Sequence, residues 1–304
     1  MAAVAPPAPA AAPTRVAARL RLLAAAVLFS TGGAAIKAAT LTAWQVASFR
    51  SGVAALAVWL LVAGARRRWS WRVLVVAAVY AATMVLFVVA NKLTTAANTI
   101  FLQSTAPLWV LLAGPFVLGE RVRRADLVAM AGVAAGMALF FVGQEAPQTT
   151  APDPARGDLL AALSGVAWGG TVLGLRWIGR HPAEAGGQPA LVTVVAGNVL
   201  ACLVCLPLAL PVADVSAADV GVVAFLGTVQ IGLAYLALAT AMPHVPALEA
   251  STLLLVEPAL NPVWAWLAHG ERPRPLAWLG GAVIVGAAML KTWWDARRVG
   301  SIQP

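Results

Sequence analysis

The chain has 304 residues, of which 61% are hydrophobic and only 11% are charged, and its mean hydropathy is +0.84. Soluble globular domains carry about 25% charged residues, so this composition excludes an ordinary soluble domain and indicates a chain surrounded by lipid. The formal net charge of +9 does not indicate nucleic-acid binding, because the basic residues form no soluble basic face.

The first 17 residues form an Ala- and Pro-rich tail that we expect to be disordered. Arg15, Arg19 and Arg21 then precede an apolar segment, as in a signal peptide. We expect this segment to be retained as the first membrane span, because a segment later in the chain resembles it.

Ten apolar segments are each long enough to cross the hydrocarbon core, which takes about 20 helical residues. In chain order they are 20–39, 43–64, 71–90, 95–118, 125–143, 157–177, 190–210, 218–241, 246–268 and 276–294. Charged and turn-forming residues separate them, and residues 144–156 are typical of a linker. The sequence therefore predicts an all-α membrane protein with ten transmembrane helices, followed by a cytoplasmic tail at 295–304.

The distribution of Lys and Arg predicts which side of the membrane holds the termini. With both termini in the cytoplasm, fifteen of these residues lie on the cytoplasmic side and six on the other. Cytoplasmic loops accumulate positive charge, so we expect cytoplasmic termini in a bacterial inner membrane. Lys37, Arg50 and Lys92 belong to the six, and we expect them to line an outer vestibule or to snorkel to the interface.

The two halves of the chain resemble each other. Leu22-Leu23-Ala24-Ala25 aligns with Leu159-Leu160-Ala161-Ala162, which pairs the first span with the sixth. Pro107 and the Gly-Glu-Arg motif after it correspond to Pro258 and the Gly-Glu-Arg motif that follows Pro258, both at an offset of 151 residues. Each repeat, 18–143 and 157–294, therefore has five spans. An odd number of spans turns the second repeat upside down, which is the architecture of inverted-repeat transporters.

A mid-helix proline and a closing Gly-Glu-Arg occur in both copies, at residues 96–124 and 247–274. In these motifs the sequence resembles the drug/metabolite transporter superfamily, EamA type, over about residues 18–294. The resemblance implies two five-helix repeats and the export of amino acids, other metabolites or xenobiotics. The YddG-like exporters of aromatic amino acids are one subgroup that it suggests.

The sequence shows no catalytic or cofactor motif. His181, His244 and His269 fall in predicted loops without metal-ligand spacing, and phosphate-binding and nucleophile motifs are absent. We therefore expect no enzyme activity, no cofactor and no metal. Cys202 and Cys205 share one helix face, and we expect them to be small buried side chains rather than a redox or metal pair.

Polar and aromatic residues near span centres are the candidates for substrate binding, because a polar group in the bilayer core is costly unless it faces a cavity or another helix. They come from spans 1, 3 and 4 and from the repeat counterparts 6, 8 and 9. The candidates are Ser30, Thr31, Tyr80, Asn98, Gln103, Trp168, Thr171, Gln230, Tyr235, Glu257, Asn261 and Trp264, with Ser104 beside them. Taken singly, each such residue more often forms a hydrogen bond between helices or turns a ring towards lipid than contacts a ligand.

The acidic residues of the spans have different interpretations. Glu257 precedes Pro258 near the centre of the ninth span; its carboxylate contacts a substrate amine, carries a coupling proton, or is a buried acid bonded to a neighbouring helix. Glu249 begins the same span, where the helix dipole favours a carboxylate. Glu120 and Glu271 close the repeats, and we expect structural ion pairs there.

The functional prediction is a secondary transporter that exports small metabolites by alternating access, with amino acids, including aromatic ones, as the leading substrate class. Its partners would be a small-molecule substrate and the lipid bilayer, and it would act as a monomer or homodimer. A strongly anionic substrate fits poorly, because we expect no Lys or Arg at the span centres. The alternatives are an exporter of drugs or other metabolites, a membrane-embedded enzyme and a membrane subunit without transport.

Overall fold

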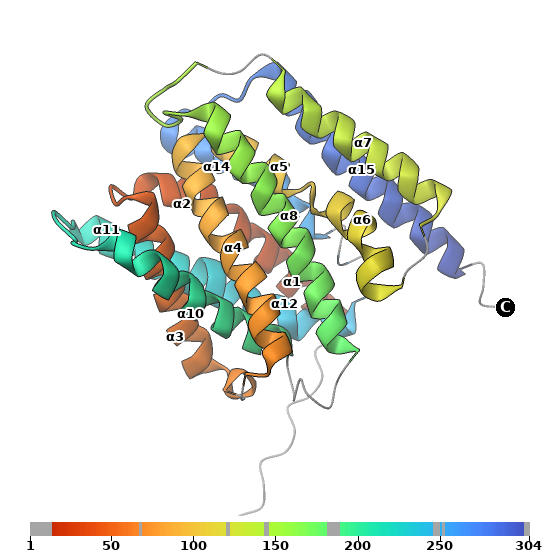
Figure 1. The fold of residues 1–304 in the computed structure, drawn as a ribbon, viewed down its shortest axis with the longest axis horizontal. Coiled ribbons are helices and arrows are strands. Elements are labelled where there is room, and N and C mark those ends of the chain that lie inside the picture. The colour runs from red at the N-terminus through yellow and green to blue at the C-terminus, as the bar shows by residue number, and fades with distance from the viewer. Residues whose placement is uncertain are drawn as a thin grey trace, which may run out of the picture.

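The computed structural model describes residues 14–66, 69–119, 122–142, 146–180, 189–245, 250 and 253–300. In this part of the chain the β pairing is limited to an isolated bridge between Gln148 and Ala151. The helices are α1 (Arg15–Ser30), α2 (Gly32–Ala38), α3 (Ala43–Leu61), η1 (Ala63–Ala65), α4 (Trp71–Leu93), α5 (Ala96–Gln103), α6 (Ala106–Leu118), α7 (Arg124–Phe141), α8 (Pro154–Gly179), α10 (Pro189–Ala209), α11 (Ala217–Phe225), the π-helix η2 (Leu226–Leu233), α12 (Ala234–Ala241), η3 (Met242–His244), α14 (Val256–His269) and α15 (Pro275–Gly300) (Figure 1).

Eight helical segments are long and apolar enough to cross a membrane. They correspond to the first eight predicted spans, with α1 and α2, α5 and α6, and α11 to α12 each forming one span. The helix α14 has 14 residues, and the apolar part of α15, Pro275–Lys291, is also shorter than these spans. The all-α membrane class is confirmed for the described residues, and the count of ten spans stays a prediction.

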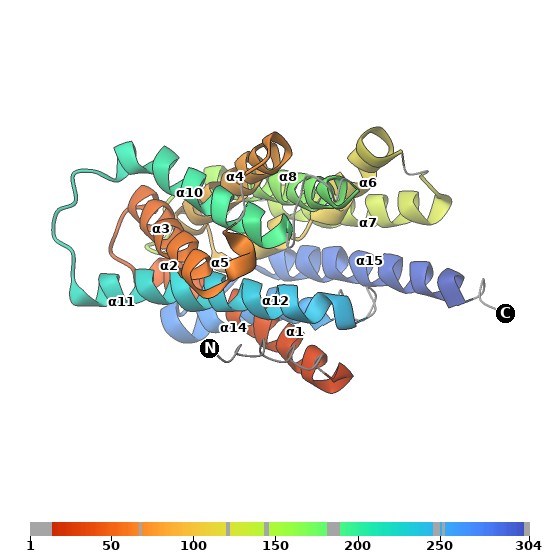
Figure 2. The same cartoon turned by 90° about the horizontal axis from the view of Figure 1, so that it is seen from below.

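Equivalent helices of the two halves run in opposite directions. At the start of α3, the Gln45 amide donates to the Ala209 carbonyl at the end of α10, at 3.2 Å. At the start of α7, Asp126 forms an ion pair with Lys291 near the end of α15, at 2.9 Å. α7 and α15 lie side by side along their length (Figures 1 and 2). Both pairs are therefore antiparallel, as an inverted repeat requires.

The packing between the halves is reciprocal. α8, the first helix of the second half, packs along α4 and against α5 and α6. Its counterpart α1 packs along α12 and η2 and against α14. Likewise α10 packs on α4, while its counterpart α3 packs on η2. Each contact thus recurs with the two halves exchanged, which is the pattern of a pseudo-two-fold axis.

Several spans are interrupted near their middles. α1 ends at Thr31, where α2 takes over, and Ser104 ends α5 ahead of α6. Leu255, which lies 151 residues after Ser104, is the turn residue before α14. Pro107 and Pro258 follow these two turns, and a proline removes a helical hydrogen bond. The eighth span instead contains the π-helix η2, a rare element that is frequent at functional sites.

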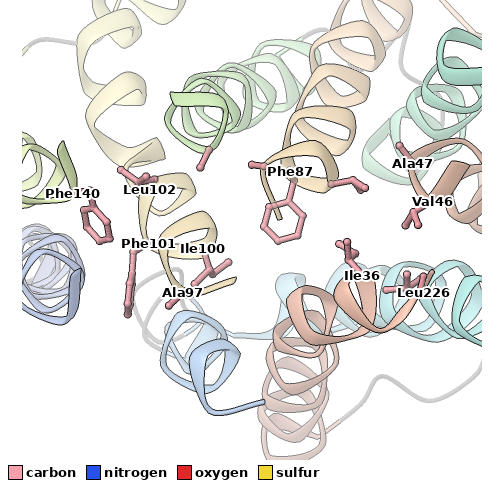
Figure 3. Close-up of a cluster of buried hydrophobic side chains, with 14 of the residues drawn as sticks. Ile36, Val46, Ala47, Phe87, Ala97, Ile100, Phe101, Leu102, Phe140 and Leu226 are labelled. Atoms are coloured by element: carbon pink, nitrogen blue, oxygen red, sulfur yellow. The ribbon is translucent and has the colours of Figure 1, made fainter. Parts of the chain in front are cut away.

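A cluster of buried apolar side chains joins the two halves (Figure 3). Ile36 and Phe87 from the first half pack with Leu226 from the second, and Phe101 lies beside Phe140 with ring centroids 6.2 Å apart. A Cβ at Gly281 of α15 would lie 2.7 Å from the Phe101 ring, so α15 approaches α5 closely. This packing fixes the helices that surround the cavity described below.

The helix starts differ slightly from the predicted boundaries. α1 begins at Arg15, because the Thr14 side chain accepts from the Ala17 amide at 3.3 Å, so the helix starts before residue 18. α8 begins at Pro154 rather than at 157, because Asp153 caps it and proline fits the first helical position. Residues 1–13, Glu120, Glu249 and His181 lie outside the described residues.

Candidate functional site

A cavity of about 500 Å³ lies among the helices. Its wall contains residues from α1, α3, α4, α5, α6, α7, α8, η2, α12, η3, α14 and α15. It extends to Met242 and Lys291, near the ends of α12 and α15. This is the end of the bundle where α1 begins, because Ala18 packs against Ala241. Drug-sized ligands occupy pockets of about 300–1,000 Å³, so the volume suits a small metabolite.

The cavity wall includes part of the predicted binding set: Gln103, Trp168, Gln230, Tyr235 and Glu257, together with Ser104. Gln103 donates its amide to Ser164 Oγ at 2.8 Å, and the Gln230 amide donates to the Phe29 carbonyl at 3.4 Å. These two hydrogen bonds hold amide groups from both halves at the wall.

Ser30, Thr31 and Trp264 lie among the helices and not at the cavity wall. Ser30 Oγ accepts from the Trp264 indole N–H at 2.8 Å and donates to the Val27 carbonyl at 2.7 Å. Thr31 Oγ1 donates to the Leu28 carbonyl at 2.7 Å. These bonds join α1 to α14 and satisfy carbonyls of the last turn of α1, where that helix ends.

Tyr80 and Thr171 lie behind the wall. The Asn198 amide donates to the Tyr80 hydroxyl at 3.1 Å. Thr171 Oγ1 donates to the Ala167 carbonyl at 3.0 Å, and it lies 3.4 Å from the hydroxyl of Thr83, which does line the cavity. Both residues support side chains that face the cavity.

The two buried asparagines differ from each other. The Asn98 amide donates to Asp158 Oδ1 at 3.1 Å, which links α5 to α8. Asn261 is fully buried, and neither polar atom of its amide has a hydrogen-bond partner among the described residues. It packs against Gly33, where a Cβ would lie 2.6 Å from Asn261 Oδ1.

Aromatic rings form one side of the cavity. Tyr235 meets the ring of Phe29 edge-on, with centroids 5.0 Å apart, and the ring of Tyr80 at 5.9 Å. Trp168 from α8 and Phe87 from α4 also line the cavity. Aromatic pairs favour such edge-to-face arrangements, so Phe29, Tyr80 and Tyr235 hold one another in place.

Arg50 is a cavity residue that the sequence reasoning missed. The prediction of an outer vestibule or a snorkelling side chain is wrong, because Arg50 is 1% exposed and lines the central cavity. It lies seven residues after Ala43, about 10 Å into α3 at 1.5 Å per residue. That depth, readable from the sequence, is the signal that could have identified it. The expectation of no central cation is wrong for the same reason.

The Arg50 guanidinium has only neutral partners among the described residues. Nη2 donates to the Met84 carbonyl at 3.1 Å and lies 3.8 Å from the Met84 sulfur, while Nε has no partner. Glu257, in the first turn of α14, is half-buried and forms no hydrogen bond or ion pair with any described residue. Tyr235 lines the same cavity as Arg50 and Glu257. One cavity therefore holds a basic and an acidic side chain, one from each half, that form no ion pair with any described residue.

The opposite end of the bundle is closed by an ion pair between the halves. Lys37 Nζ lies 2.8 Å from Glu271 Oε1, and the two side chains are 4% and 1% exposed. Lys37 also donates to the carbonyls of Thr94, at 2.8 Å, and Thr150. Glu271 Oε2 accepts from the Ala96 amide at 2.9 Å. The expected structural ion pair of Glu271 thus involves Lys37 of the first half, which does not snorkel.

Two further predictions concern side chains away from the cavity. Lys92 is half-buried and donates to the carbonyl of Ala39, just after α2, at 2.6 Å, and its expected place in an outer vestibule or at the interface stays a prediction. Cys202 and Cys205 are free thiols, and Cys205 belongs to the apolar core. In the described part of the chain, no group of three or more His, Cys, Asp and Glu is placed to hold a metal ion.

Comparisons with known proteins give the family. The model of the EamA-like transporter family matches residues 18–142 and 155–293, one match in each half. A solved crystal structure with 22% sequence identity covers 91% of this chain and 98% of its own, with a TM-score of 0.62, and so has a similar fold. None of the curated proteins is similar enough in sequence to count as a relative. Because the family model covers nearly all of both halves, the chain belongs to the EamA-like transporter family of multi-pass membrane proteins.

Proposed function

We propose that this transporter exports small metabolites, with amino acids as the leading substrate class, from the cytoplasm of a bacterial cell by alternating access. One observation carries the proposal: a cavity of about 500 Å³ between inverted halves reaches one end of the bundle and is closed at the other by Lys37 and Glu271. Such a cavity is accessible from one side at a time, as alternating access requires.

The direction of the cavity fits an inward-facing state. The excess of Lys and Arg places both termini in the cytoplasm, and the cavity reaches the end where α1 begins. The closed end then faces outwards. Because the halves are inverted copies with reciprocal packing, an exchange of their conformations closes the inner end and opens the outer one. The turns before Pro107 and Pro258 are suited to this motion, since helices bend most easily at such breaks.

The wall of the cavity favours a modest, partly apolar substrate. Tyr235, Phe29 and Trp168 offer rings for an apolar side chain. Glu257 offers a carboxylate that has no partner among the described residues, and a substrate ammonium group would satisfy it. An amino acid with an apolar or aromatic side chain combines both features.

Efflux from proteoliposomes loaded with radiolabelled amino acids tests the proposal. We expect the wild-type protein to release at least one amino acid faster than empty liposomes do. Glu257→Gln separates two roles of the carboxylate, and Asp153→Asn, at the N-terminus of α8 outside the cavity, is the matched control.

The dependence on a pH gradient distinguishes the roles of Glu257. If a gradient drives wild-type efflux and not that of Glu257→Gln, Glu257 carries the coupling proton. If the gradient has no effect on either protein and Glu257→Gln transports more slowly, the carboxylate binds the substrate. Absence of release across a broad amino-acid panel would refute the amino-acid proposal, and release of dyes or drugs by the same liposomes would favour the xenobiotic alternative.

A further inference from the structure

Arg50 places a buried guanidinium at the wall of a membrane cavity, and no described residue provides a counter-ion. It is 1% exposed, its Nη2 donates to a neutral carbonyl, and its Nε has no hydrogen-bond partner in the described part of the chain. A buried cation is costly unless an anion compensates it. Among the described residues no carboxylate lies within ion-pair distance of it, so the compensating anion is to be sought in a ligand.

We infer that Arg50 and Glu257 bind the two charged groups of a zwitterionic α-amino acid, the guanidinium holding the carboxylate and Glu257 holding the ammonium. The inference rests on the proposed function, because it assigns the substrate contacts of the proposed transport cavity. A guanidinium offers planar, paired donors that match a carboxylate, and a carboxylate accepts the donors of an ammonium group.

The remaining charges of the cavity favour a substrate that is neutral overall. Lys291 also lines the cavity, but Asp126 neutralises it at a distance of 2.9 Å. The Arg50 guanidinium and the Glu257 carboxyl group are then left without ion-pair partners among the described residues. A zwitterion satisfies both charges at once. A simple amine or a simple carboxylate satisfies one and leaves the other buried and uncompensated.

The side chain of the amino acid would lie against Tyr235. This residue lines the same cavity as Arg50 and Glu257, and its ring packs edge-on against Phe29. A substrate that spans the two charges therefore lies beside the aromatic wall, which favours an apolar or aromatic side chain.

The two charged residues come from different halves of the molecule. Arg50 belongs to α3 in the first half and Glu257 to α14 in the second. A zwitterion held by both would connect the halves, so its binding energy depends on their relative position. Differential binding of this kind is what allows a ligand to shift a conformational equilibrium.

Binding of related ligands to the full-length protein in detergent, measured by titration calorimetry, tests the assignment. The ligands are L-phenylalanine, L-leucine and L-methionine, together with L-phenylalaninamide, which lacks the carboxylate, and 3-phenylpropionate, which lacks the ammonium. We expect Arg50→Gln to weaken L-phenylalanine binding about 10- to 100-fold, the usual loss for a hydrogen-bonded charge, and to leave the amide unaffected. Glu257→Gln should weaken L-phenylalanine similarly and leave 3-phenylpropionate unaffected.

Arg50→Lys, which keeps the charge and loses the planar donor pair, should bind L-phenylalanine with intermediate affinity. Arg156→Gln, an exposed arginine beside Asp153, is the control and should bind as wild type. Melting curves show whether each variant is folded. If Arg50→Gln is unfolded, the assignment is tested instead by Arg50→Lys and by the binding of 3-phenylpropionate to Glu257→Gln. An equal loss for L-phenylalanine and its amide in Arg50→Gln would overturn the inference, as would wild-type protein that binds none of the three amino acids.

The transport assay keeps this inference separate from the proposed function. If liposomes release another metabolite while no zwitterion binds, transport stands and the charge assignment fails. If the binding pattern appears and no flux is measured, the charge assignment stands and transport fails.

Discussion

At the residue scale, two consecutive glycines on α2 allow three other spans to approach the first span. A Cβ at Gly32 would lie 2.8 Å from the Gln230 amide nitrogen, and a Cβ at Gly33 would lie 2.6 Å from Asn261 Oδ1 and 2.9 Å from the Ala96 Cβ. Real Cβ atoms do not approach other atoms this closely, so a side chain at either position forces its neighbours to shift. At Gly32 the end of the Gln230 side chain can move, whereas at Gly33 the Ala96 Cβ moves only with its helix. The pair thus sets how closely α2 approaches η2, α14 and α5.

We expect Gly33→Ala to lower the free energy of unfolding by about 1–3 kcal/mol, the usual cost of overpacking. Thermal unfolding in detergent, followed by circular dichroism at 222 nm, measures the change. Gly286→Ala on α15 is the control, because nothing lies within 4 Å of its Cβ position. It should be neutral or slightly stabilising, since alanine favours helix. Equal melting temperatures for the two variants would contradict the close approach at Gly33.

The residue scale also shows why the candidate site could be predicted only in part. The sequence gives the depth of a polar residue along a span but not the face on which it lies. Asn98 and Gln103 are five positions apart, so at about 100° per residue their side chains point about 140° apart. Gln103 faces the cavity, and Asn98 faces Asp158 on α8. Arg50 was assigned by membrane side rather than by depth, and so its place at the cavity was missed.

At the scale of elements, α5 is too short to be stable by itself. It has eight residues, and isolated helices shorter than about 12 residues are marginal in water. Two acceptors hold its N-terminus. Thr95 Oγ1 accepts from the backbone N–H of Asn98 at 3.2 Å, and Glu271 Oε2 accepts from the backbone N–H of Ala96 at 2.9 Å. The second acceptor comes from the other half, so the start of α5 depends on the packing of the two halves.

We expect Glu271→Ala to destabilise the protein by about 3–5 kcal/mol, because it removes the acceptor and leaves Lys37 as a buried cation without its ion pair. Glu271→Gln retains an acceptor oxygen for the Ala96 amide and should cost less. Thermal unfolding of both variants in detergent ranks them. If Gln is as destabilising as Ala, the hydrogen bond to α5 contributes nothing and the ion pair alone holds this end.

Elements were predicted more accurately than their interruptions. The long apolar runs are sufficient to identify the spans, because lipid demands about 20 apolar residues per helix. Pro107 and Pro258 indicate breaks, since proline cannot donate to the helical ladder. The π-helix η2 leaves no such mark in the sequence. It lies where Gln230 meets Gly32 and where α3 packs closely on the eighth span, so its register is set by packing with other helices.

At the scale of the molecule, the repeat in the sequence predicts more than any single motif does. The constant offset of 151 between Pro107 and Pro258 relates equivalent residues, and an odd number of spans inverts the second copy. The antiparallel pairs of α3 with α10 and α7 with α15 agree with that inversion. The repeat alone does not predict which end is closed, because it relates the two ends to each other as equivalents. The Lys37–Glu271 pair breaks this equivalence, since Lys37 has Gly174, not a lysine, at the equivalent position of the first-span alignment.

That asymmetry makes the Lys37–Glu271 pair the point at which the outer end can be tested. Replacing both residues, as Lys37→Met with Glu271→Gln, removes the ion pair without leaving an uncompensated buried charge. We expect the outward-open population to rise. The reporter is a single cysteine, introduced by Met84→Cys in a chain that lacks Cys202 and Cys205. It should react about tenfold faster with a membrane-impermeant maleimide added outside. That rise requires a shift of about 1.4 kcal/mol in the conformational equilibrium. Arg156→Gln, exposed at the same end, should leave the labelling rate unchanged. If the double variant labels no faster than its parent, the ion pair does not hold the outer end closed, and the apolar packing around Ile36 and Phe87 is then sufficient to do so.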